Sequence, residues 1–481
     1  METNGSPEVP EALCLIDGQW IAGEGPCKET ISPSTGKPVS KVHFSSAAQV
    51  DAAVKAAERA QRDWARRPMA ERADILIRAV DAIVPHVEEL SVWVSREMGK
   101  TIHESRYEMG PLTVGVSKAA VEDARRFGGS APPPYDAAHT TRRVMTVYEP
   151  IGVVGLISPW NFPVDMLVGC VAALAVGNAV VWKPSEWAPL SPQLTAKVFA
   201  EAGLPAGVFN LVYGGPEIGE ELVTHPGVGA IGFIGSTAVG EQITRAAGVK
   251  RLLLELGGNG PMVVLDDADV DAAVASAVES CFYMAGQVCT AAERLIVHEA
   301  IHDEFVSKLV ERAKALRMGD PLDESTEMGP LSEERIMAKV ERHVEDARAQ
   351  GATIEVGGRR DGMYYEATVL TGVRPGMQIA DEETFGPVAP IIKVASAAEA
   401  LAIANDSPYG LSMAVWTSSL KSAFEMASGL QAGSVAVNGG TNDWEINAPF
   451  GGYKKSGIGR ELGEDSLRAF TNAKTISFNT L

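Results

Sequence analysis

The chain has 481 residues, of which 46% are hydrophobic and 22% are charged, an ordinary balance for a soluble globular protein. Its formal net charge of −20 argues against binding to nucleic acid or to an anionic membrane surface, because both attract basic proteins. Five cysteines, an odd number with no CxxC pair, are too few for a disulfide framework, so we expect a reducing, cytoplasmic environment.

The first 150 residues predict turns, then helices, then one strand. The stretch METNGSPEVPEALCL has no basic segment leading into an apolar run, so no signal peptide is expected. Residues 1–45 are rich in Gly, Pro, Ser and Thr, which is typical of turns and short strands. From residue 47 to about 126, apolar residues recur every three or four positions, which predicts helices. After a loop at 128–139, RRVMTVYEP (142–150) is predicted to be a strand.

From residue 151 onward, short apolar strands alternate with helices. The expected strands are IGVVGLIS, AVVWKPS, VFNLVYG, AIGFIG and RLLLELGG, with helices at 165–176, 191–202, 216–224 and 237–247. A second run begins at GPMVVLDD and continues through a helix at 269–285, the strand RLIVH and a helix at 300–317, to about residue 440. Continuous apolar strands alternating with helices predict parallel sheets covered on both faces. The fold class is therefore α/β, with two doubly wound sheets and a cleft between them.

The segment GSTAVG (235–240) follows a predicted strand and opens a helix. Gly235 permits a tight turn, and the helix N-terminus presents free N–H groups that suit a phosphate. Its GxxxxG spacing resembles the start of an ATP-binding P-loop, but Glu241 and Gln242 stand where that loop needs Lys and Ser/Thr. An ATP or GTP site is therefore not expected.

The segment HEAIH (298–302) matches the zinc-peptidase pattern HExxH. That chemistry needs both histidines on one face of one helix. Here His298 ends the predicted strand RLIVH, which places the two histidines on different elements. We therefore predict no metal. The longest apolar stretch, 166–176, is far shorter than a membrane span, so no membrane contact is expected either.

Six further segments occur in a fixed order along the chain. They are PWNFP (159–163), WKPSE (182–186), LELGGN (254–259), GQVC (286–289), EETFGP (382–387) and PFGGYKKSGIGRELG (449–463). Together they resemble the aldehyde dehydrogenase superfamily, whose members oxidise aldehydes with NAD(P), and the resemblance covers nearly the whole chain.

The resemblance implies three structural parts. A Rossmann-like NAD-binding domain is expected at 10–126 and 149–256, and a catalytic domain at 257–466. A small β oligomerisation flap is expected at 127–148 and 467–481. Because a bare sheet edge invites aggregation, pairing of this flap in a homodimer or homotetramer is expected.

The resemblance assigns three catalytic residues. Cys289 is the expected nucleophile, because a thiolate that adds to an aldehyde forms a thiohemiacetal from which hydride leaves more easily. Asn161 and the Cys289 N–H are the expected oxyanion donors. Glu255, costly to bury as a charge in the apolar strand RLLLELGG, matches the base that activates water on the thioester.

Glu255 also bears on the alternatives. CoA-acylating members typically lack this residue, so its presence favours hydrolysis to the free acid. A CoA-acylating semialdehyde dehydrogenase and a catalytically idle structural relative remain the rival interpretations.

The resemblance also assigns the cofactor contacts. Lys183 and Glu186 match positions that hold the adenosine ribose, and Glu186 would repel a 2′-phosphate, which favours NAD over NADP. Glu383 matches the residue that binds the nicotinamide ribose, and Phe385 would pack beside the nicotinamide ring. The other implied contacts are Trp160, Ser185, Gly219, Gly235, Ser236 and Gly257.

The substrate, a small-molecule aldehyde, is read from the expected tunnel. The residues at the family's tunnel positions are Phe162, Met166, Tyr283, Trp444 and Phe450. This aromatic set suits aromatic or medium-chain apolar aldehydes. Asp165 and Glu445 lie nearby in sequence, and we expect both to face solvent because isolated acids are mostly exposed. If either faced the tunnel, a cationic aminoaldehyde would be favoured.

Overall fold

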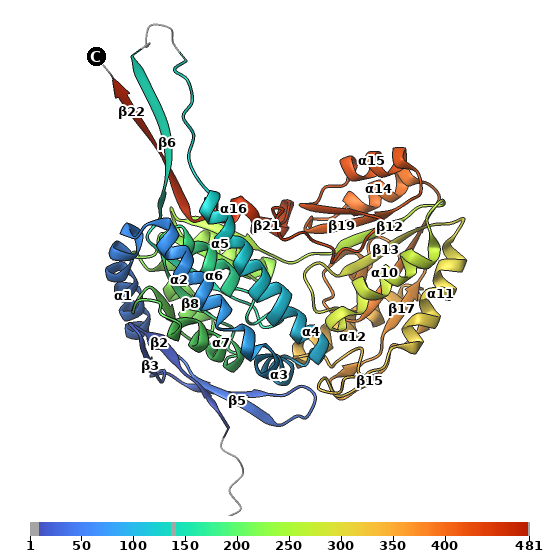
Figure 1. Cartoon of the computed structure of the whole chain (residues 1–481). Helices are drawn as coiled ribbons and strands as arrows, with labels where there is room; N and C mark the ends of the chain where they lie inside the picture. The colour runs from blue at the N-terminus through green and yellow to red at the C-terminus, as the bar shows by residue number, and fades with distance from the viewer. Residues whose placement is uncertain (1–8, 136–140, 480–481) are drawn as a thin grey trace, which may run out of the picture.

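Two α/β units lie side by side in the computed structural model, and a two-stranded ribbon projects from one of them (Figure 1). The structure describes residues 9–135 and 141–479. Residues 1–8 of the predicted N-terminal turns, and residues 136–140 and 480–481 of the predicted flap, lie outside these ranges. Buried apolar side chains form one large cluster around each of the two main sheets.

The first sheet has eight strands, and its five central strands are parallel because buried helices connect them. Nearly every residue of these central strands is buried, as their apolar sequences predict. In spatial order the strands are β21 (Gly457–Ile458), β11 (Arg251–Glu255), β10 (Ala230–Ile234), β7 (Val153–Ile157), β8 (Ala179–Lys183), β9 (Phe209–Leu211), β2 (Cys14–Ile16) and β3 (Gln19–Ile21).

Helices cover both faces of the first sheet. One face is covered by α1 (Ala47–Arg66) and α8 (Pro216–Thr224), with α9 (Thr237–Ala246) beside them. The other face is covered by α6 (Leu167–Ala175) and α7 (Leu190–Glu201). An outer layer packs on these two: α2 (Met69–Asp81), α3 (Val87–Met98), α4 (Ile102–Tyr107), the π-helical segment η2 (Glu108–Val116) and α5 (Ser117–Arg126). A smaller sheet below holds β1 (Glu11–Ala12), β5 (Pro38–His43) and β4 (Cys27–Ile31).

The second sheet has seven strands, of which six run parallel. Their order is β14 (Thr353–Val356), β17 (Thr368–Thr371), β18 (Val388–Val394), β13 (Ala292–His298), β12 (Gly260–Val264), β19 (Ser412–Trp416) and β20 (Ser434–Val437). Helices α10 (Val270–Phe282) and α11 (His302–Ala315) pack on one side. The other helices of this unit are α12 (Glu334–Ala349), α13 (Gln378–Asp381), α14 (Ala397–Asn405) and α15 (Leu420–Gly429), and β15 (Arg360–Asp361) pairs with β16 (Tyr364–Tyr365).

The chain returns to the first sheet near residue 457, a return that the predicted domain bounds do not include. Gly457 and Ile458 in β21 pair antiparallel with β11, and α16 (Gly463–Ala469) packs on α5 and α6. Residues 457–466, which we assigned to the catalytic domain, therefore belong structurally to the first unit, because the edge of β11 offers them backbone hydrogen bonds.

The ribbon consists of two long antiparallel strands far apart in sequence. β6 (Arg142–Pro150) matches the predicted strand, and β22 (Thr471–Asn479) pairs with it along its whole length. Most side chains of both strands are exposed or half-exposed, including Met145 and Phe478. In the described part of the chain, no helix is long and apolar enough to cross a membrane.

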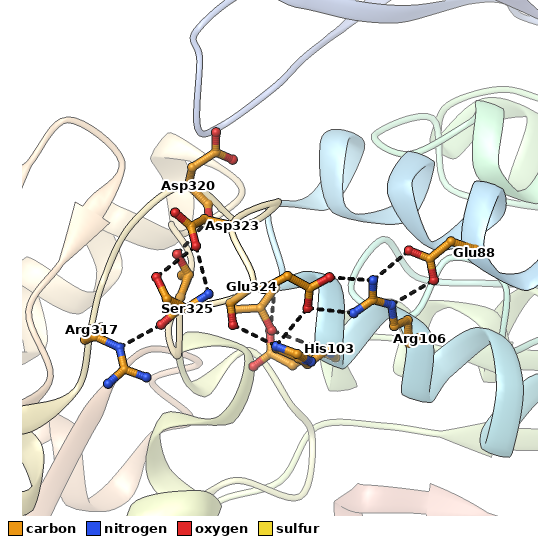
Figure 2. Close-up of polar contacts among 11 residues, drawn as sticks. Glu88, His103, Arg106, Arg317, Asp320, Asp323, Glu324 and Ser325 are labelled. Atoms are coloured by element: carbon orange, nitrogen blue, oxygen red, sulfur yellow. Dashed lines mark hydrogen bonds and ion pairs between the residues drawn. The ribbon is translucent and has the colours of Figure 1, made fainter.

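An ion-pair network joins the outer helices of the first unit to the second unit (Figure 2). The Arg106 guanidinium in α4 donates to both carboxylate oxygens of Glu88 in α3, at 2.6 and 2.8 Å. It also donates to both oxygens of Glu324, at 2.7 and 2.8 Å, in the loop between α11 and α12. The His103 ring lies 2.9 Å from the Glu324 carbonyl oxygen, and the Ile102 N–H donates to the Pro321 carbonyl at 2.7 Å. These contacts link the outer helices of the first unit to the loop between α11 and α12 in the second unit.

Candidate active site

The site forms where the carboxyl edge of the first sheet meets the amino edge of the second. Parallel pairing aligns Ile157 with Lys183, and Ile234 with Glu255, so four strands of the first sheet end together. The chain then crosses from Glu255 to β12 through only four residues, 256–259. Ligands of open α/β sheets bind beyond the carboxyl ends of the strands, and the second sheet closes that space here.

A cavity of about 900 Å³ occupies this junction. Its walls include the three predicted catalytic residues, Asn161, Glu255 and Cys289. The predicted cofactor contacts on its walls are Trp160, Lys183, Ser185, Glu186, Gly219, Gly235, Ser236, Gly257, Glu383 and Phe385. Four predicted tunnel residues also line it: Phe162, Met166, Trp444 and Phe450. Residues up to about 300 positions apart in sequence thus share one cavity.

Cys289 follows a turn in an unusual backbone conformation. The predicted helix at 269–285 ends at Phe282, because Met284 and Ala285 adopt φ values of +52° and +53°. Gly286 follows at φ +73°. Non-glycine residues rarely adopt this left-handed conformation, and when they do they cluster at functional sites. The turn redirects the chain so that Cys289 reaches the cavity wall.

Buried polar contacts hold this turn in place. The Glu104 carboxylate accepts a hydrogen bond from the Met284 N–H at 2.6 Å, and the Gln287 side chain donates to the Met284 carbonyl at 2.9 Å. A Cβ at Gly258 would lie 2.2 Å from the Cys289 carbonyl oxygen, so only glycine fits there. Contacts from α4 and from the crossover segment 256–259 therefore fix the position of Cys289.

The Cys289 thiol rests protonated at neutral pH. Burial raises its pKa first, and the negative charges of Glu255, Glu383 and Asp165 raise it further. These causes place three carboxyl groups near the sulfur. The thiol of Cys289 is half-buried at the cavity wall, whereas Cys14, Cys170 and Cys281 are sealed in the core.

Asn161 is oriented toward the Cys289 turn. Its buried Nδ2 donates to the Gln287 carbonyl at 3.0 Å, which leaves a second N–H on the same nitrogen. The loop that carries Asn161 is held by Glu108, whose carboxylate accepts from the Val164 N–H at 2.9 Å. Sequence reasoning missed Glu108 because its partner lies 56 positions away.

Glu255 ends β11 with 2% of its surface exposed. Neither carboxyl oxygen has a hydrogen-bond partner among the described residues. Burial raises its pKa well above the ordinary range, and the charge of Glu461 adds to the effect. A Cβ at Gly451 would lie 2.5 Å from Glu255 Oε1, so the backbone packs directly on this carboxyl. A buried carboxyl without a partner is poised to take a proton from a molecule that enters the cavity.

The residues of the cofactor end fit a dinucleotide. Lys183 Nζ lies 3.8 Å from Glu186 Oε2, and both groups face the cavity, which suits ribose hydroxyls. Burial lowers the pKa of Lys183, and Glu186 opposes this shift. Ser236 caps α9 by accepting a hydrogen bond from the Val239 N–H at 3.4 Å, so the helix N-terminus faces the cavity as predicted for a phosphate.

Glu293 was missed by sequence reasoning, yet it shapes the cofactor end. Its two buried oxygens accept hydrogen bonds from the Thr384 and Phe385 N–H groups, each at 2.6 Å. Phe385 is thereby held at φ +61°, while Glu383 accepts from the Gly258 N–H at 3.0 Å. Burial and the charge of Glu383 raise the pKa of Glu293 to about 8. The available signal was a Glu within an apolar strand, the same signal that singled out Glu255.

The substrate end departs from prediction at two residues. Tyr283 is not part of the cavity wall, and its side chain packs on the buried cluster that includes Met98 and Met284. Asp165 lines the cavity, so the expectation that it faces solvent is wrong. Glu445 is exposed, as expected.

The HExxH histidines lie on different elements, as predicted. His298 is the last residue of β13, and His302 begins α11. Within residues 9–135 and 141–479, no group of three or more His, Cys, Asp or Glu side chains is arranged to hold a metal ion.

Comparison with known proteins identifies the family. The model of the aldehyde dehydrogenase family matches residues 20–476. The chain belongs to this family. Its α/β architecture, predicted from strand–helix alternation, is confirmed by this aldehyde dehydrogenase match and by solved structures of the same fold.

Aldehyde dehydrogenases named for different substrates resemble the chain almost equally. A probable succinate-semialdehyde dehydrogenase [NADP(+)] of Sinorhizobium fredii is 39% identical, over 97% of this chain and 96% of the relative. Vanillin dehydrogenase of Corynebacterium glutamicum is also 39% identical, over 96% of both chains. A crystal structure of betaine aldehyde dehydrogenase from Staphylococcus aureus in complex with NAD+ is 34% identical, with a TM-score of 0.93 over 98% of this chain and 95% of that one. Family membership alone therefore leaves the aldehyde open.

Proposed function

We propose that this protein oxidises an aldehyde to the free carboxylic acid, with NAD as the cofactor. The observation that supports it most is the single cavity that brings Cys289, Asn161 and Glu255 together with Lys183 and Glu186. The first unit would bind the cofactor and the second would supply the nucleophile. Bound NAD would accept the hydride that the aldehyde carbon gives up.

Formation of the first covalent bond is assigned to Cys289. The thiol must lose its proton, which we assign to water in the cavity that passes it on to solvent, so this step does not require Glu255. The sulfur then bonds to the carbonyl carbon, and the carbonyl electron pair moves to oxygen. The remaining Asn161 N–H and the Cys289 N–H would stabilise that oxyanion, where loss of one donor costs roughly 3–4 kcal/mol.

Release of the product is assigned to Glu255. Its carboxylate would take a proton from water, whose oxygen attacks the thioester carbon. The carbon–sulfur bond then breaks, and the carboxylic acid leaves with the thiolate restored. A buried base without a structural partner supports hydrolysis over transfer of the acyl group to CoA.

The cofactor is proposed to be NAD rather than NADP. The Glu186 carboxylate lies on the cavity wall beside Lys183, the only cation within 4 Å of it among the described residues. A carboxylate accepts hydrogen bonds from ribose hydroxyls and repels a 2′-phosphate. NADP use at lower efficiency is compatible with the neighbouring lysine.

The walls at the substrate end suit an apolar aldehyde body. The Trp444 and Phe450 rings pack with their centroids 5.5 Å apart and their planes tilted by 40°, and Phe162 and Met166 line the same cavity. These rings would accept an aromatic or medium-chain aldehyde. Asp165 adds a requirement that is argued in the next subsection.

We also propose that the ribbon of β6 and β22 pairs in a homodimer or homotetramer. No second strand pairs with the outer edge of β22 within the described chain, whereas the Thr146 N–H of β6 donates to the Ser130 carbonyl at 2.8 Å. Exposed Met145 and Phe478 add apolar area. Light scattering after gel filtration tests this: a monomer at micromolar concentration would contradict it.

A test of the activity uses the purified protein with benzaldehyde or hexanal and NAD. We expect NADH and the carboxylic acid to form in equal amounts. If no carboxylic acid forms without CoA and acyl-CoA forms when CoA is added, the reaction is acylation of CoA and not hydrolysis. Failure with every aldehyde, by a protein that still binds NAD, would support a catalytically idle relative.

A further inference from the structure

Asp165 presents an unpaired carboxylate to the substrate end of the cavity. It lies on the loop before α6 and lines the wall together with Phe162 and Met166. Its side chain makes no hydrogen bond or ion pair with any residue in the described ranges. The nearest cation whose charge acts on it, Lys100, is already engaged: its Nζ lies 2.7 Å from Glu108 Oε2 and 4.1 Å from the Phe162 ring centre.

Ionising the Asp165 carboxyl group costs free energy in its present surroundings. Burial raises the pKa of Asp165 to about 7, and the charge of Glu108 adds to that effect. Glu461 lines the same wall, and its pKa is raised to about 8 by burial and by Asp165. Because each carboxylate makes ionisation of the other less favourable, a positively charged ligand between them would stabilise the ionised form of both.

The basic residues of the cavity lie elsewhere. Those on its wall within the described chain are Lys183, Arg245, Arg335 and Lys339. Lys183 ends β8 and Arg245 lies in α9, both on the side of the cofactor contacts, and the charge of Lys339 acts on Glu293 and Glu383. No described basic side chain lines the part of the wall formed by Asp165, Trp444 and Phe450.

We propose that Asp165 selects aldehydes that carry a positively charged nitrogen. The inference rests on the proposed oxidation and names the substrate class of the same site. A carboxylate on the same cavity wall as a pair of aromatic rings is the chemistry that recognises quaternary and primary ammonium groups. An aldehyde with a carboxylate, such as the one named for the Sinorhizobium relative, would be repelled by the same wall.

The test compares aldehydes that differ only in charge. Trimethylammonioacetaldehyde and 3,3-dimethylbutanal have the same shape, as do 4-trimethylammoniobutanal and 5,5-dimethylhexanal. The native protein should oxidise the charged member of at least one pair with the higher kcat/KM. Asp165→Asn should lower that preference roughly 10- to 100-fold, as expected when one partner of a desolvated charge pair is removed. A parallel series with 3-aminopropanal and butanal separates primary from quaternary ammonium recognition.

Glu445→Gln serves as the matched control. Glu445 is an exposed acid beside Trp444, so the control removes one carboxylate from the same region of the chain but not from the cavity. It should leave the preference unchanged. An equal loss for charged and neutral aldehydes in Asp165→Asn would make Asp165 a structural residue and overturn the proposal. A native preference for the neutral members would overturn it too.

Inhibition of the native protein provides a readout that does not depend on the variant folding. Choline should compete with 3,3-dimethylbutanal at lower concentration than its neutral isostere 3,3-dimethylbutan-1-ol. Equal inhibition by both alcohols would contradict the charge selection. If neutral aldehydes are oxidised and these outcomes fail, only the substrate class is wrong; if no aldehyde is oxidised, the proposed function itself falls.

Discussion

The cofactor end and the substrate end of the cavity are built from different kinds of chain. The cofactor end follows the aligned carboxyl ends of β8 and β10, where regular strands fix each side chain. The substrate end is formed by irregular segments: the π-helical segment η2, the loop before α6 and the stretch from 444 to 462. Regular strands therefore position the side chains that would bind the cofactor, and irregular segments position the side chains that would select the aldehyde.

The two ends also differ in charge. Basic side chains line the cofactor end, as phosphates require, whereas Asp165 and Glu461 line the substrate end. Cys289 lies where the ends meet. Substitutions at the junction should therefore abolish turnover. Substitutions at the cofactor end should alter only the preference between NAD and NADP, and those at the substrate end only the preference between charged and neutral aldehydes.

The largest effect is expected from Cys289→Ser at the junction. A hydroxyl is a much weaker nucleophile than a thiol, so NADH formation should fall by about 10³-fold or more. Binding of NAD, followed by quenching of protein fluorescence, should persist. Cys27→Ser, at an exposed cysteine outside the cavity, is the control and should retain full activity. Persistent oxidation by Cys289→Ser would remove the nucleophile assignment.

Glu255→Gln should separate the two chemical steps. Water activation would be lost while the first covalent step survives, so stopped-flow absorbance should show a burst of NADH followed by turnover slowed roughly 10²-fold. The acid product should trail NADH by one equivalent per site during the burst. An unchanged steady-state rate would mean that another group serves as the base.

The family resemblance, and not the apolar pattern alone, assigned the residues of the cofactor end and the junction, and several of its motifs lie at the ends of strands with a clear apolar pattern. The ends of AVVWKPS and RLLLELGG placed Lys183 and Glu255 at one edge of one sheet, and the structure aligns these strand ends. The two-sheet α/β fold was likewise predictable from alternation alone, and the family match confirms it.

The substrate end was less predictable because its side chains depend on contacts distant in sequence. Tyr283 turns away where Met284 adopts a left-handed conformation that Glu104 stabilises from 180 positions away. Asp165 faces inward on a loop tied to Glu108. No local pattern carries either contact, so exposure statistics gave the wrong answer for Asp165.

At the cofactor end, Glu186→Ser should raise the ratio of kcat/KM for NADP to that for NAD by about 10-fold, because repulsion of the 2′-phosphate is removed. The preference between charged and neutral aldehydes should stay constant. Steady-state rates with both cofactors and one aldehyde pair measure both ratios. An unchanged cofactor ratio would move this selectivity to another residue.

At the substrate end, pH should alter the aldehyde preference alone. Because the pKa of Asp165 is raised to about 7, the group is neutral below that pH and ionised above it. The kcat/KM ratio of 4-trimethylammoniobutanal to 5,5-dimethylhexanal should therefore rise several-fold as the pH increases, with a midpoint near pH 7. The midpoint reflects Asp165 in the free enzyme, because the pH dependence of kcat/KM reports ionisations of the free enzyme. The titratable or charged groups linked to Asp165 electrostatically are Lys100, Tyr107, Glu108, Cys289 and Glu461. Titrations of these groups that affect both aldehydes equally cancel in the kcat/KM ratio. In Asp165→Asn the ratio should not change with pH.

The smallest effect is expected from Arg106→Ala, outside both ends. Its ion pairs with Glu88 and Glu324 are exposed to solvent, so their loss should lower the free energy of unfolding only slightly. Urea denaturation followed by fluorescence measures this, with Arg126→Ala as a control, since Arg126 pairs only with Asp123 three residues away on its own helix. Both selectivity ratios should match the native protein. A shifted aldehyde ratio with an unshifted cofactor ratio would show that the substrate end alone depends on how the second unit docks, because Arg106 lies two residues before the π-helical segment that lines that end.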